Sequence, residues 1–402
     1  MSENKFVLKR HVTIKKLLGP AVLLANRLKF NIDVEKFSDQ DGQYLIMMNH
    51  TTGGDQFFVS MAFNKPIYFI ASEDLFTNGF ISKALSYVQG PIPIKKNATD
   101  VRAVKQSMRV AKEGGSICLA PEGNRTYSGA TGYMNPAITK FARSRKLPVA
   151  VCLIEGGYGK MPRWADKVRS GKMTARVSKV VQPENYLKLS DEELLKLIHD
   201  NLDIDESTSN EEFFCKNNAE YVERFLYICP ECGLSTFESS GDHIRCRKCG
   251  NESIYTSKKT LEPLKGEMPY RNLKEWYDAQ ENFINSTDTI KEYGKDKPVY
   301  KDSTKLINVI PYVKKIKLAE NAEVRLYSDR ITATYEGTEL VLDFDNVTAV
   351  SCVNRNKLNI YHNDKVYQFK GDKRFNPLKY MHFYYRYQHI IKGENDDKFL
   401  GL

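Results

Sequence analysis

The chain has 402 residues, of which 41% are hydrophobic and 27% are charged, a balance typical of globular proteins with large cores. This length predicts two or three domains. Residues 1–190 carry 29 Lys and Arg against 14 Asp and Glu, a net charge of +15, whereas the remainder carries 31 against 36, a net charge of −5. The basic half therefore predicts an acidic partner, either phosphate groups or an anionic membrane surface, with a merely solvated basic surface as the alternative.

The sequence favours neither a membrane-spanning nor a secreted protein. No stretch approaches the roughly 18 uninterrupted apolar residues of a membrane-spanning helix. The longest apolar run near the N-terminus contains Gly19 and Pro20 and is followed by no small-residue cleavage site, so we expect no secretory signal. Four of the eight cysteines form two tight pairs, which indicates a metal site in a reducing compartment rather than a disulfide framework.

Residues 1–37 mix basic and apolar positions in a pattern that predicts an amphipathic helical segment. Ile14, Leu17, Leu18, Val22, Leu24 and Leu28 alternate with lysines and arginines. Such a helix can lie in a membrane interface, and we expect a cytoplasmic protein that is peripheral (monotopic) on the cytoplasmic membrane face. A plain surface helix packed on the domain would show the same amphipathic pattern.

Residues 38–205 alternate short apolar runs with helical patterns. Tyr44–Met48, Ile67–Ile70, Ser116–Leu119 and Val149–Ile154 have the character of buried strands, and Val101–Glu113 has helical spacing. This alternation predicts an α/β domain, with a central sheet flanked by helices. Residues 189–203 and 210–226 are also expected to be helical.

A histidine and an aspartate follow the first expected strand, in the run Asn49-His50-Thr51-Thr52-Gly53-Gly54-Asp55. The two glycines permit a tight turn that can bring His50 and Asp55 together. A carboxylate bonded to one imidazole nitrogen leaves the other nitrogen to take a proton from an alcohol. This spacing alone is a weak signal, because most such pairs are structural.

A second element follows another expected strand about seventy residues later, in the run Pro121-Glu122-Gly123-Asn124-Arg125. Arg125 offers a planar fork of donors for a phosphate, and Gly123 lets the backbone approach it. Glu122 would either anchor Arg125 or bind a substrate hydroxyl. Cys118, in the strand before this run, is interpreted as a buried packing residue.

With both elements present, the sequence resembles the glycerophospholipid acyltransferase family, which includes 1-acyl-sn-glycerol-3-phosphate acyltransferases. Asn49, His50 and Asp55 match the family's Asn-His-x₄-Asp block, and Pro121, Glu122, Gly123 and Arg125 match its Pro-Glu-Gly-x-Arg block. The glycine-led block between them is represented by residues 90–96, with Lys96 in place of the usual arginine. Leu147-Pro148-Val149-Ala150-Val151 resembles the fourth block, with Val151 in place of its second proline. The resemblance covers roughly residues 40–180.

The resemblance implies direct acyl transfer. His50, held by Asp55, would deprotonate the acceptor hydroxyl, whose oxygen then attacks the thioester of acyl-CoA or acyl-carrier protein. Glu122, Gly123, Arg125 and Lys96 would bind the acceptor, most simply 1-acylglycerol 3-phosphate, with glycerol 3-phosphate or another lysolipid as alternatives. The competing hypothesis is a membrane- or protein-binding scaffold with a degenerate acyltransferase domain.

Residues 206–258 are expected to form a helix followed by a metal site. Cys229-Pro-Glu-Cys232 and Cys246-Arg-Lys-Cys249 are two C-x₂-C pairs, each followed by glycine. Two such pairs make a closed tetrahedral Cys₄ site, so the segment resembles a zinc ribbon with a structural zinc ion. A redox dithiol is the weaker alternative. The segment has no clear basic and aromatic face, so a nucleic-acid partner is not favoured.

The last third divides into a helical linker at residues 259–305 and a strand-rich module at residues 306–402. Six short alternating strands, beginning near Val324 and ending near Phe369, precede a final helix at Pro377–Ile391. This order resembles a pleckstrin-homology-like or GRAM-like all-β barrel with a capping helix. The aromatic residues of the final helix are expected to pack against the barrel rather than to form an exposed binding face.

Overall fold

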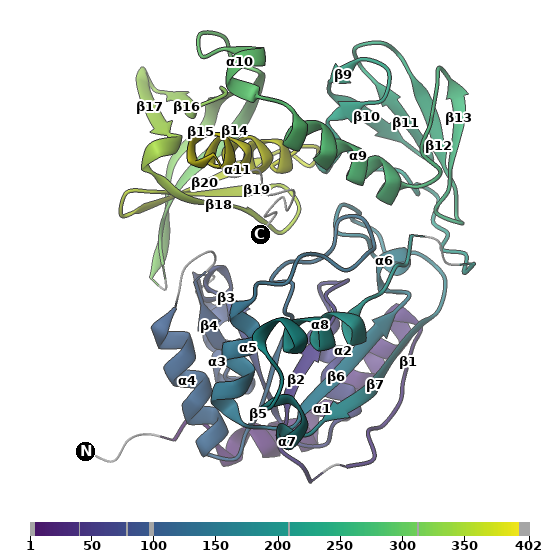
Figure 1. The fold of residues 1–402 in the computed structure, drawn as a ribbon, viewed down its shortest axis with the longest axis vertical. Coiled ribbons are helices and arrows are strands. Elements are labelled where there is room, and N and C mark those ends of the chain that lie inside the picture. Colours follow the sequence, from purple (N-terminus) through teal and green to yellow (C-terminus); the bar gives the residue numbers. More distant parts are fainter. Residues whose placement is uncertain are drawn as a thin grey trace. The chain divides into compact units, whose positions relative to one another are not determined.

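The computed structural model describes residues 5–39, 41–77, 79–95, 100–207, 210–311 and 313–393. The chain forms two compact units (Figure 1). The N-terminal unit comprises Met1–Arg163 and Lys167–Phe214, and the C-terminal unit comprises Trp164–Asp166 and Cys215–Leu402. The short segment Trp164–Asp166 therefore belongs to the C-terminal unit, although its sequence neighbours on both sides belong to the other unit.

The N-terminal unit is built on a seven-stranded sheet in which only one pair of neighbouring strands is antiparallel. The order is β1 (Ile32–Val34), β7 (Met173–Val181), β6 (Val149–Glu155), β2 (Leu45–Met48), β5 (Ser116–Leu119), β3 (Ile67–Ser72) and β4 (Ile92–Ile94). Strands β6 and β7 form the antiparallel pair. Since β2 and β5 are parallel neighbours, the loops that follow them leave the sheet at the same edge.

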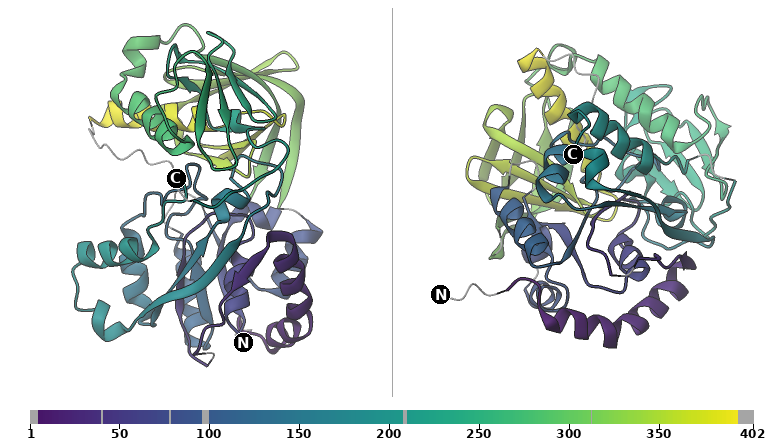
Figure 2. Two further views of the ribbon diagram at one scale, coloured as in Figure 1. Left: turned by 90° about the vertical axis from the view of Figure 1, so that its right-hand side faces the viewer. Right: turned by 60° about the horizontal axis from the view of Figure 1, so that its bottom comes forward.

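Helices cover both faces of this sheet. Side chains from α1 (Lys9–Phe30) and α2 (Asp55–Ala62) pack on one face, against a cluster that includes Ile46, Cys118 and Cys152. Side chains from α4 (Val101–Lys112), α5 (Ala137–Arg145) and α8 (Asp191–Leu202) pack on the other face. In Figure 2, left, the strands of this unit lie between α1 and the helices of the opposite face. Successive strand residues alternate between the two clusters, which is the two-residue period of a sheet covered on both faces.

The expected α/β class of this unit is confirmed, and most of its elements lie where the sequence predicts them. The shorter elements of the unit are η1 (Glu73–Thr77), α3 (Phe80–Val88), α6 (Gly157–Lys160) and α7 (Pro183–Tyr186). Helix α8 begins with a capping box, in which the Ser190 side chain accepts from the Glu193 amide and the Glu193 side chain accepts from the Ser190 amide.

The C-terminal unit begins with the cysteine-bearing segment. Strands β8 (Ile228–Cys229) and β9 (Gly233–Leu234) form a small hairpin. They are followed by a four-stranded antiparallel sheet of β10 (Phe237–Ser240), β11 (His243–Cys246), β12 (Glu252–Tyr255) and β13 (Leu261–Lys265). Two helices follow, α9 (Leu273–Ser286) and α10 (Thr289–Tyr293).

The rest of the unit is an antiparallel seven-stranded half-barrel, visible in Figure 2, with a helix packed against it. Its strands, in spatial order, are β17 (Thr338–Asp343), β16 (Arg330–Tyr335), β15 (Lys314–Leu326), β14 (Tyr300–Ile310), β20 (Lys365–Gly371), β19 (Lys357–His362) and β18 (Val347–Val353). Helix α11 (Leu378–Lys392) buries Tyr380, Phe383, Tyr384 and Tyr387, so the expectation that its aromatic residues pack inward is confirmed.

Two expectations about secondary structure were wrong. Residues 210–226 form turns and one short 3₁₀ segment, η2 (Val222–Arg224), instead of a helix. Their backbone amides bond to side chains, as when Cys215 N–H donates to Asn218 Oδ1, and Tyr221 has a left-handed φ of 76° that ends any helical run. Strand structure also begins earlier than expected, because β14 starts at Tyr300 within the expected linker.

Candidate active site

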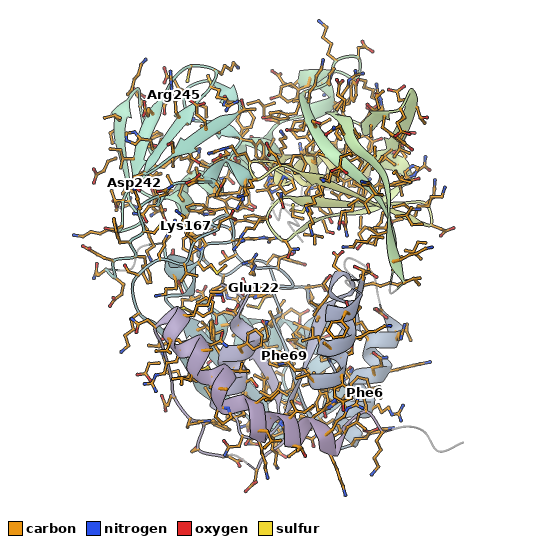
Figure 3. The ribbon with its side chains drawn as sticks, turned by 180° about the vertical axis from the view of Figure 1, so that it is seen from behind. Phe6, Phe69, Glu122, Lys167, Asp242 and Arg245 are labelled. Carbon is orange, nitrogen blue, oxygen red and sulfur yellow. The ribbon has the colours of Figure 1, made fainter. Side chains whose placement is uncertain are left out.

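His50, Asp55, Glu122 and Arg125 gather at the carboxyl ends of β2 and β5. His50 follows β2 and Glu122 follows β5, and the two strands are hydrogen-bonded parallel neighbours. Figure 3 shows Glu122 toward one end of the N-terminal unit and Phe6 toward the opposite end, with Phe69 of β3 between them. In α/β sheets, the carboxyl edge is where ligands bind.

His50 and Asp55 are in direct contact. The His50 Nδ1 atom lies 2.7 Å from Asp55 Oδ2. The imidazole side chain is 25% exposed, whereas the carboxylate is fully buried. When Asp55 is ionised, it accepts the Nδ1 proton and leaves Nε2 as the nitrogen that can act on a substrate hydroxyl.

Asp55 is fixed by the turn that connects it to His50. Its carboxylate accepts from the Thr51 amide at 2.8 Å, from the Thr52 amide at 3.0 Å and from the Thr52 hydroxyl at 2.6 Å. It is also the first residue of α2, where the helix dipole favours a negative charge. These contacts fix the position of the buried carboxylate.

Both carboxylate oxygens of Glu122 accept from backbone amides. Oε1 accepts from His50 N–H at 3.0 Å, and Oε2 accepts from Gly132 N–H at 2.8 Å. The side chain is 4% exposed. Burial raises the pKa of Glu122 to about 7, since the two amide bonds that favour the charged form only partly offset it, and the charges of Asp55 and Asp203 add to the rise.

The loop after β5 is docked on the backbone of His50. Glu122 accepts the His50 amide proton, and Thr126 N–H donates to the His50 carbonyl at 3.0 Å. Gly123 lies between these contacts with a φ of 67°, a left-handed conformation that favours glycine. The backbone position of His50 thus depends on a loop about seventy residues away in the sequence.

Arg125 lies near the turn that carries His50. A Cβ atom placed on Gly53 would lie 3.9 Å from Nη1 of Arg125. Arg163 contacts the same loop, since its Nη1 donates to the Arg125 carbonyl at 2.9 Å and its guanidinium lies 4.0 Å from the centroid of the Tyr127 ring. A cationic group is therefore placed beside the His50–Asp55 turn, where an anionic substrate group could be held.

Asn49 extends the sheet beyond the end of β2. Its Oδ1 accepts from Ile154 N–H at 2.8 Å, and its Nδ2 donates to the Ile154 carbonyl at 2.8 Å. The side chain is 1% exposed. The amide therefore replaces a pair of backbone bonds between β2 and β6 and fixes the point at which the chain turns toward His50.

Lys96, the other cationic residue that the resemblance assigned to acceptor binding, lies outside the described residues. The block that precedes it does have a defined structure. Gly90 has a φ of 56°, and Ile92–Ile94 form β4, which pairs with β3.

Cys118 is fully buried and its pKa is raised by burial, as expected for a packing residue rather than a nucleophile.

The four paired cysteines come together in the C-terminal unit. The sulfur atoms of Cys229, Cys232, Cys246 and Cys249 all lie within 4.8 Å of one another. The distances Cys229 Sγ–Cys249 Sγ and Cys232 Sγ–Cys246 Sγ are both 3.6 Å. Tetrahedral Zn–S bonds of about 2.3 Å place sulfur atoms about 3.8 Å apart, so these residues fit a structural zinc ion.

Sequence reasoning missed the residues that hold the site together. Asn49 was recognised only as part of a motif, and the contact of Arg163 with the Arg125 carbonyl was not anticipated. Glu206, whose buried carboxylate accepts from the Gly157 amide at 3.2 Å and the Tyr158 amide at 2.6 Å, was also missed. Glu206 and Arg163 follow no motif, and their partners are far away in the sequence, so the sequence carried no signal for either contact.

Two segments of the chain match models of known protein families. Residues 29–155 match the family model described as Acyltransferase. Residues 222–259 match a zinc-ribbon model described as DNA directed RNA polymerase, 7 kDa subunit. Two segments of the chain are therefore similar to an acyltransferase domain and to a zinc ribbon, respectively.

Two individual relatives are also similar to this chain. A probable 1-acyl-sn-glycerol-3-phosphate acyltransferase of Mycoplasma pneumoniae is 26% identical over 123 residues, which is 29% of this chain and 46% of that protein. The chain thus spans about half the length of this curated relative. The crystal structure of the 1-acyl-sn-glycerophosphate acyltransferase PlsC from Thermotoga maritima is 22% identical, with a TM-score of 0.41 over 49% of this chain and 81% of that chain.

Proposed function

We propose that this protein transfers a fatty acyl group from a thioester, acyl-CoA or acyl-carrier protein, to the hydroxyl of 1-acylglycerol 3-phosphate. The product would be phosphatidic acid. The observation that carries the proposal is the 2.7 Å contact between His50 Nδ1 and Asp55 Oδ2, made at the sheet edge where Arg125 also lies. The match of residues 29–155 to the acyltransferase model supports the same reaction class.

The chemistry assigned to each residue follows from its position. His50 Nε2 takes the proton of the acceptor hydroxyl while the oxygen attacks the thioester carbonyl carbon. The tetrahedral intermediate then expels the thiolate, which accepts the proton from Nε2. No acyl group becomes attached to the protein. Asp55 stabilises the imidazolium between these two steps, and Arg125 holds the acceptor phosphate.

Glu122 and Gly123 receive a different role from the one the sequence predicted. Both Glu122 oxygens hold backbone amides, so we assign Glu122 to the positioning of His50 rather than to substrate contact. Gly123 allows the turn in which this happens. Arg125 remains the residue proposed to bind the phosphate.

The reaction is proposed to occur at a membrane surface, because both the acceptor and the product are amphiphilic. Among the described residues, no helix has the length and apolar character needed to cross a membrane. Helix α1 exposes Leu17, Leu18, Leu24 and Leu28, next to exposed Lys16, Arg27 and Lys29. An apolar stripe beside cationic side chains supports peripheral binding to an anionic surface.

The test is an acyl-transfer assay with purified full-length protein. Labelled acyl-CoA or acyl-carrier protein is incubated with 1-acylglycerol 3-phosphate, glycerol 3-phosphate and an uncharged lysolipid. We expect transfer to 1-acylglycerol 3-phosphate, and we expect His50→Ala to reduce its rate by about 10²–10⁴-fold. Near-full activity of His50→Ala would disprove the mechanism, and no transfer to any acceptor would favour the scaffold hypothesis.

A further inference from the structure

A surface hollow of about 290 Å³ lies in the N-terminal unit, between the carboxyl-terminal ends of α4 and α5. These two helices lie side by side on one face of the sheet (Figure 1). The hollow is lined by Met108, Ala111, Lys112, Ser144, Arg145 and Leu147. Lys112 is the last residue of α4, and Arg145 is the last residue of α5. The hollow therefore combines two cationic side chains with an apolar wall.

The hollow lies at the opposite edge of the sheet from the candidate active site. Lys112 and Leu147 precede the amino ends of β5 and β6. His50 and Glu122 instead follow the carboxyl ends of β2 and β5. The three strands run in the same direction, because β2 is parallel to both β5 and β6. A ligand in the hollow would therefore occupy a second site, separate from the proposed acceptor site.

Arg145 brings a buried positive charge to this hollow. The residue is 6% exposed. Its Nη2 atom donates to the Val104 carbonyl at 3.1 Å and to the Ser107 hydroxyl at 2.5 Å, and its Nη1 atom donates to the Ser144 hydroxyl at 2.7 Å. The buried Nε atom has no hydrogen-bond partner. Burial lowers the pKa of Arg145 to about 10, so the guanidinium stays charged at neutral pH although its acceptors are uncharged.

The charge of Arg145 has no counter-ion. Among the residues that the structure describes, no carboxylate forms an ion pair with it. Glu113, which follows α4, accepts from Arg109 and from two backbone amides, and Asp191 pairs with Arg143 of α5. The carboxyl-terminal ends of the two helices supply only partial negative charge. Since buried charges in proteins are paired or bind ligands, the hollow lacks an anion.

We propose that the hollow between α4 and α5 is a second ligand site, which binds a soluble organic phosphate. The phosphate group supplies the missing counter-charge to Arg145 and Lys112. The organic part packs against Met108 and Leu147. Helix α1, whose exposed leucines are proposed to bind a membrane, packs on the other face of the sheet, so a ligand from solution is favoured over a lipid head group. The site does not depend on the proposed function.

The experiment is a calorimetric titration of the full-length protein with glycerol 3-phosphate. It is made with the Arg125→Ala variant as the reference protein, so that the proposed acceptor site does not contribute. We expect one site per chain. Arg145→Met should weaken the binding about tenfold, as expected when a charged hydrogen-bond donor is lost. Lys112→Met should weaken it by a smaller factor, because Lys112 is exposed. Inorganic phosphate should bind at the same site, but less tightly.

Further variants separate a specific effect from a loss of net charge or of stability. Lys105→Met and Lys140→Met each remove an exposed lysine of the same helices outside the hollow, and both should bind like the reference protein. Met108→Glu keeps the test decisive if Arg145→Met does not fold. Met108 lines the hollow and is 37% exposed, so this substitution places a carboxylate there without emptying the core, and it should abolish the binding of glycerol 3-phosphate.

Two further measurements complete the test. Glycerol 3-phosphate should raise the thermal midpoint of the reference protein but not that of Met108→Glu in the same background, because only the former binds the ligand. Sedimentation with anionic vesicles should give equal partition for the reference protein and for Arg145→Met. Reduced partition of Arg145→Met would show that the ligand is a lipid head group and would overturn the choice of a soluble phosphate. No titratable binding in the reference protein, or unchanged binding by both Arg145→Met and Met108→Glu, would overturn the site itself.

Discussion

His50 is held through its side chain and through both of its backbone polar groups. The imidazole contacts Asp55, the amide donates to Glu122, and the carbonyl accepts from Thr126. A general base needs this restriction, because proton transfer depends on a distance of about 3 Å to the substrate hydroxyl. The motif supplies the proposed base, and the loop after β5 holds its backbone in place.

Replacement of Glu122 by glutamine should change how stability depends on pH. Burial raises the pKa of Glu122 from its ordinary value of 4.5 to about 7. Between these values the folded protein keeps a proton that the unfolded chain has released, so this group's contribution to stability falls as pH rises from 4.5 to 7. Glu122→Gln removes that contribution, and its thermal midpoint should fall less over this range than that of the parent.

The measurement is the thermal midpoint of both proteins at pH 5, 6 and 7. Glu184→Gln is the matched control, because Glu184 is exposed and the substitution changes the charge equally. We expect this control to follow the parent. Parallel curves for the parent and Glu122→Gln would show that Glu122 titrates near its ordinary pKa.

The sequence was sufficient to predict that His50 and Asp55 approach each other, because they flank a glycine-containing turn after a strand. It was not sufficient to predict the role of Glu122. That role depends on Gly132, ten residues further along, and on the pairing of β2 with β5, which no local pattern encodes. Contacts within a turn can be read from spacing, whereas contacts across a sheet require its strand order.

At the scale of secondary-structure elements, strand ends are fixed by side chains as well as by the hydrogen-bond ladder. Strand β2 pairs with β6 through Met48, and the Asn49 amide then bonds both backbone groups of Ile154. Similar logic explains the error at residues 210–226, where the Asn218 side chain bonds the Cys215 amide in place of a helical bond. Polar side chains near element ends limit what apolar periodicity can predict.

Removal of the Asn49 amide should destabilise the N-terminal unit. Asn49→Ala leaves the amide and carbonyl of Ile154 buried without their partner, which we expect to cost roughly 2–4 kcal/mol. Asn49→Asp keeps an acceptor for the Ile154 amide but sets a buried carboxylate oxygen against the Ile154 carbonyl, so it should cost at least as much at neutral pH. In urea denaturation followed by circular dichroism, both variants should be less stable than the parent. Equal stability of all three proteins would show that the sheet edge forms without this side chain.

Zinc removal should destabilise the ribbon segment of the C-terminal unit. The hairpin of β8 and β9, the end of β11 and the turn that follows it present the four thiolates, and such short strands bury little apolar surface of their own. We expect one zinc ion per chain by atomic absorption and loss of that zinc in Cys246→Ala. A strong chelator should lower the thermal midpoint of the parent. Cys352→Ala is the control, since Cys352 is buried away from the cluster and should leave the zinc content unchanged.

At the scale of the whole molecule, charge is divided along the sequence. The first 190 residues carry a net charge of +15 and contain the candidate active site, whereas the remainder carries −5. An α/β domain, a ribbon and a strand-rich module could be expected from strand and cysteine patterns, but the inclusion of the ribbon and the half-barrel in one compact unit could not. The assignment of Trp164–Asp166 to the C-terminal unit could not, because three residues carry no periodicity.

The charge and the exposed stripe of α1 together predict binding to anionic vesicles. Leu17 and Leu28 are 73% and 76% exposed, and the insertion of one leucine contributes about 1.5–3 kcal/mol. Leu17→Ser with Leu28→Ser should therefore lower the partition of the protein to vesicles at least tenfold in a sedimentation assay. High salt should weaken the binding of the parent by screening the lysines and arginines. Leu187→Ser with Leu264→Ser removes two exposed leucines elsewhere and should bind like the parent. Equal binding by both double variants would show that α1 is an ordinary surface helix.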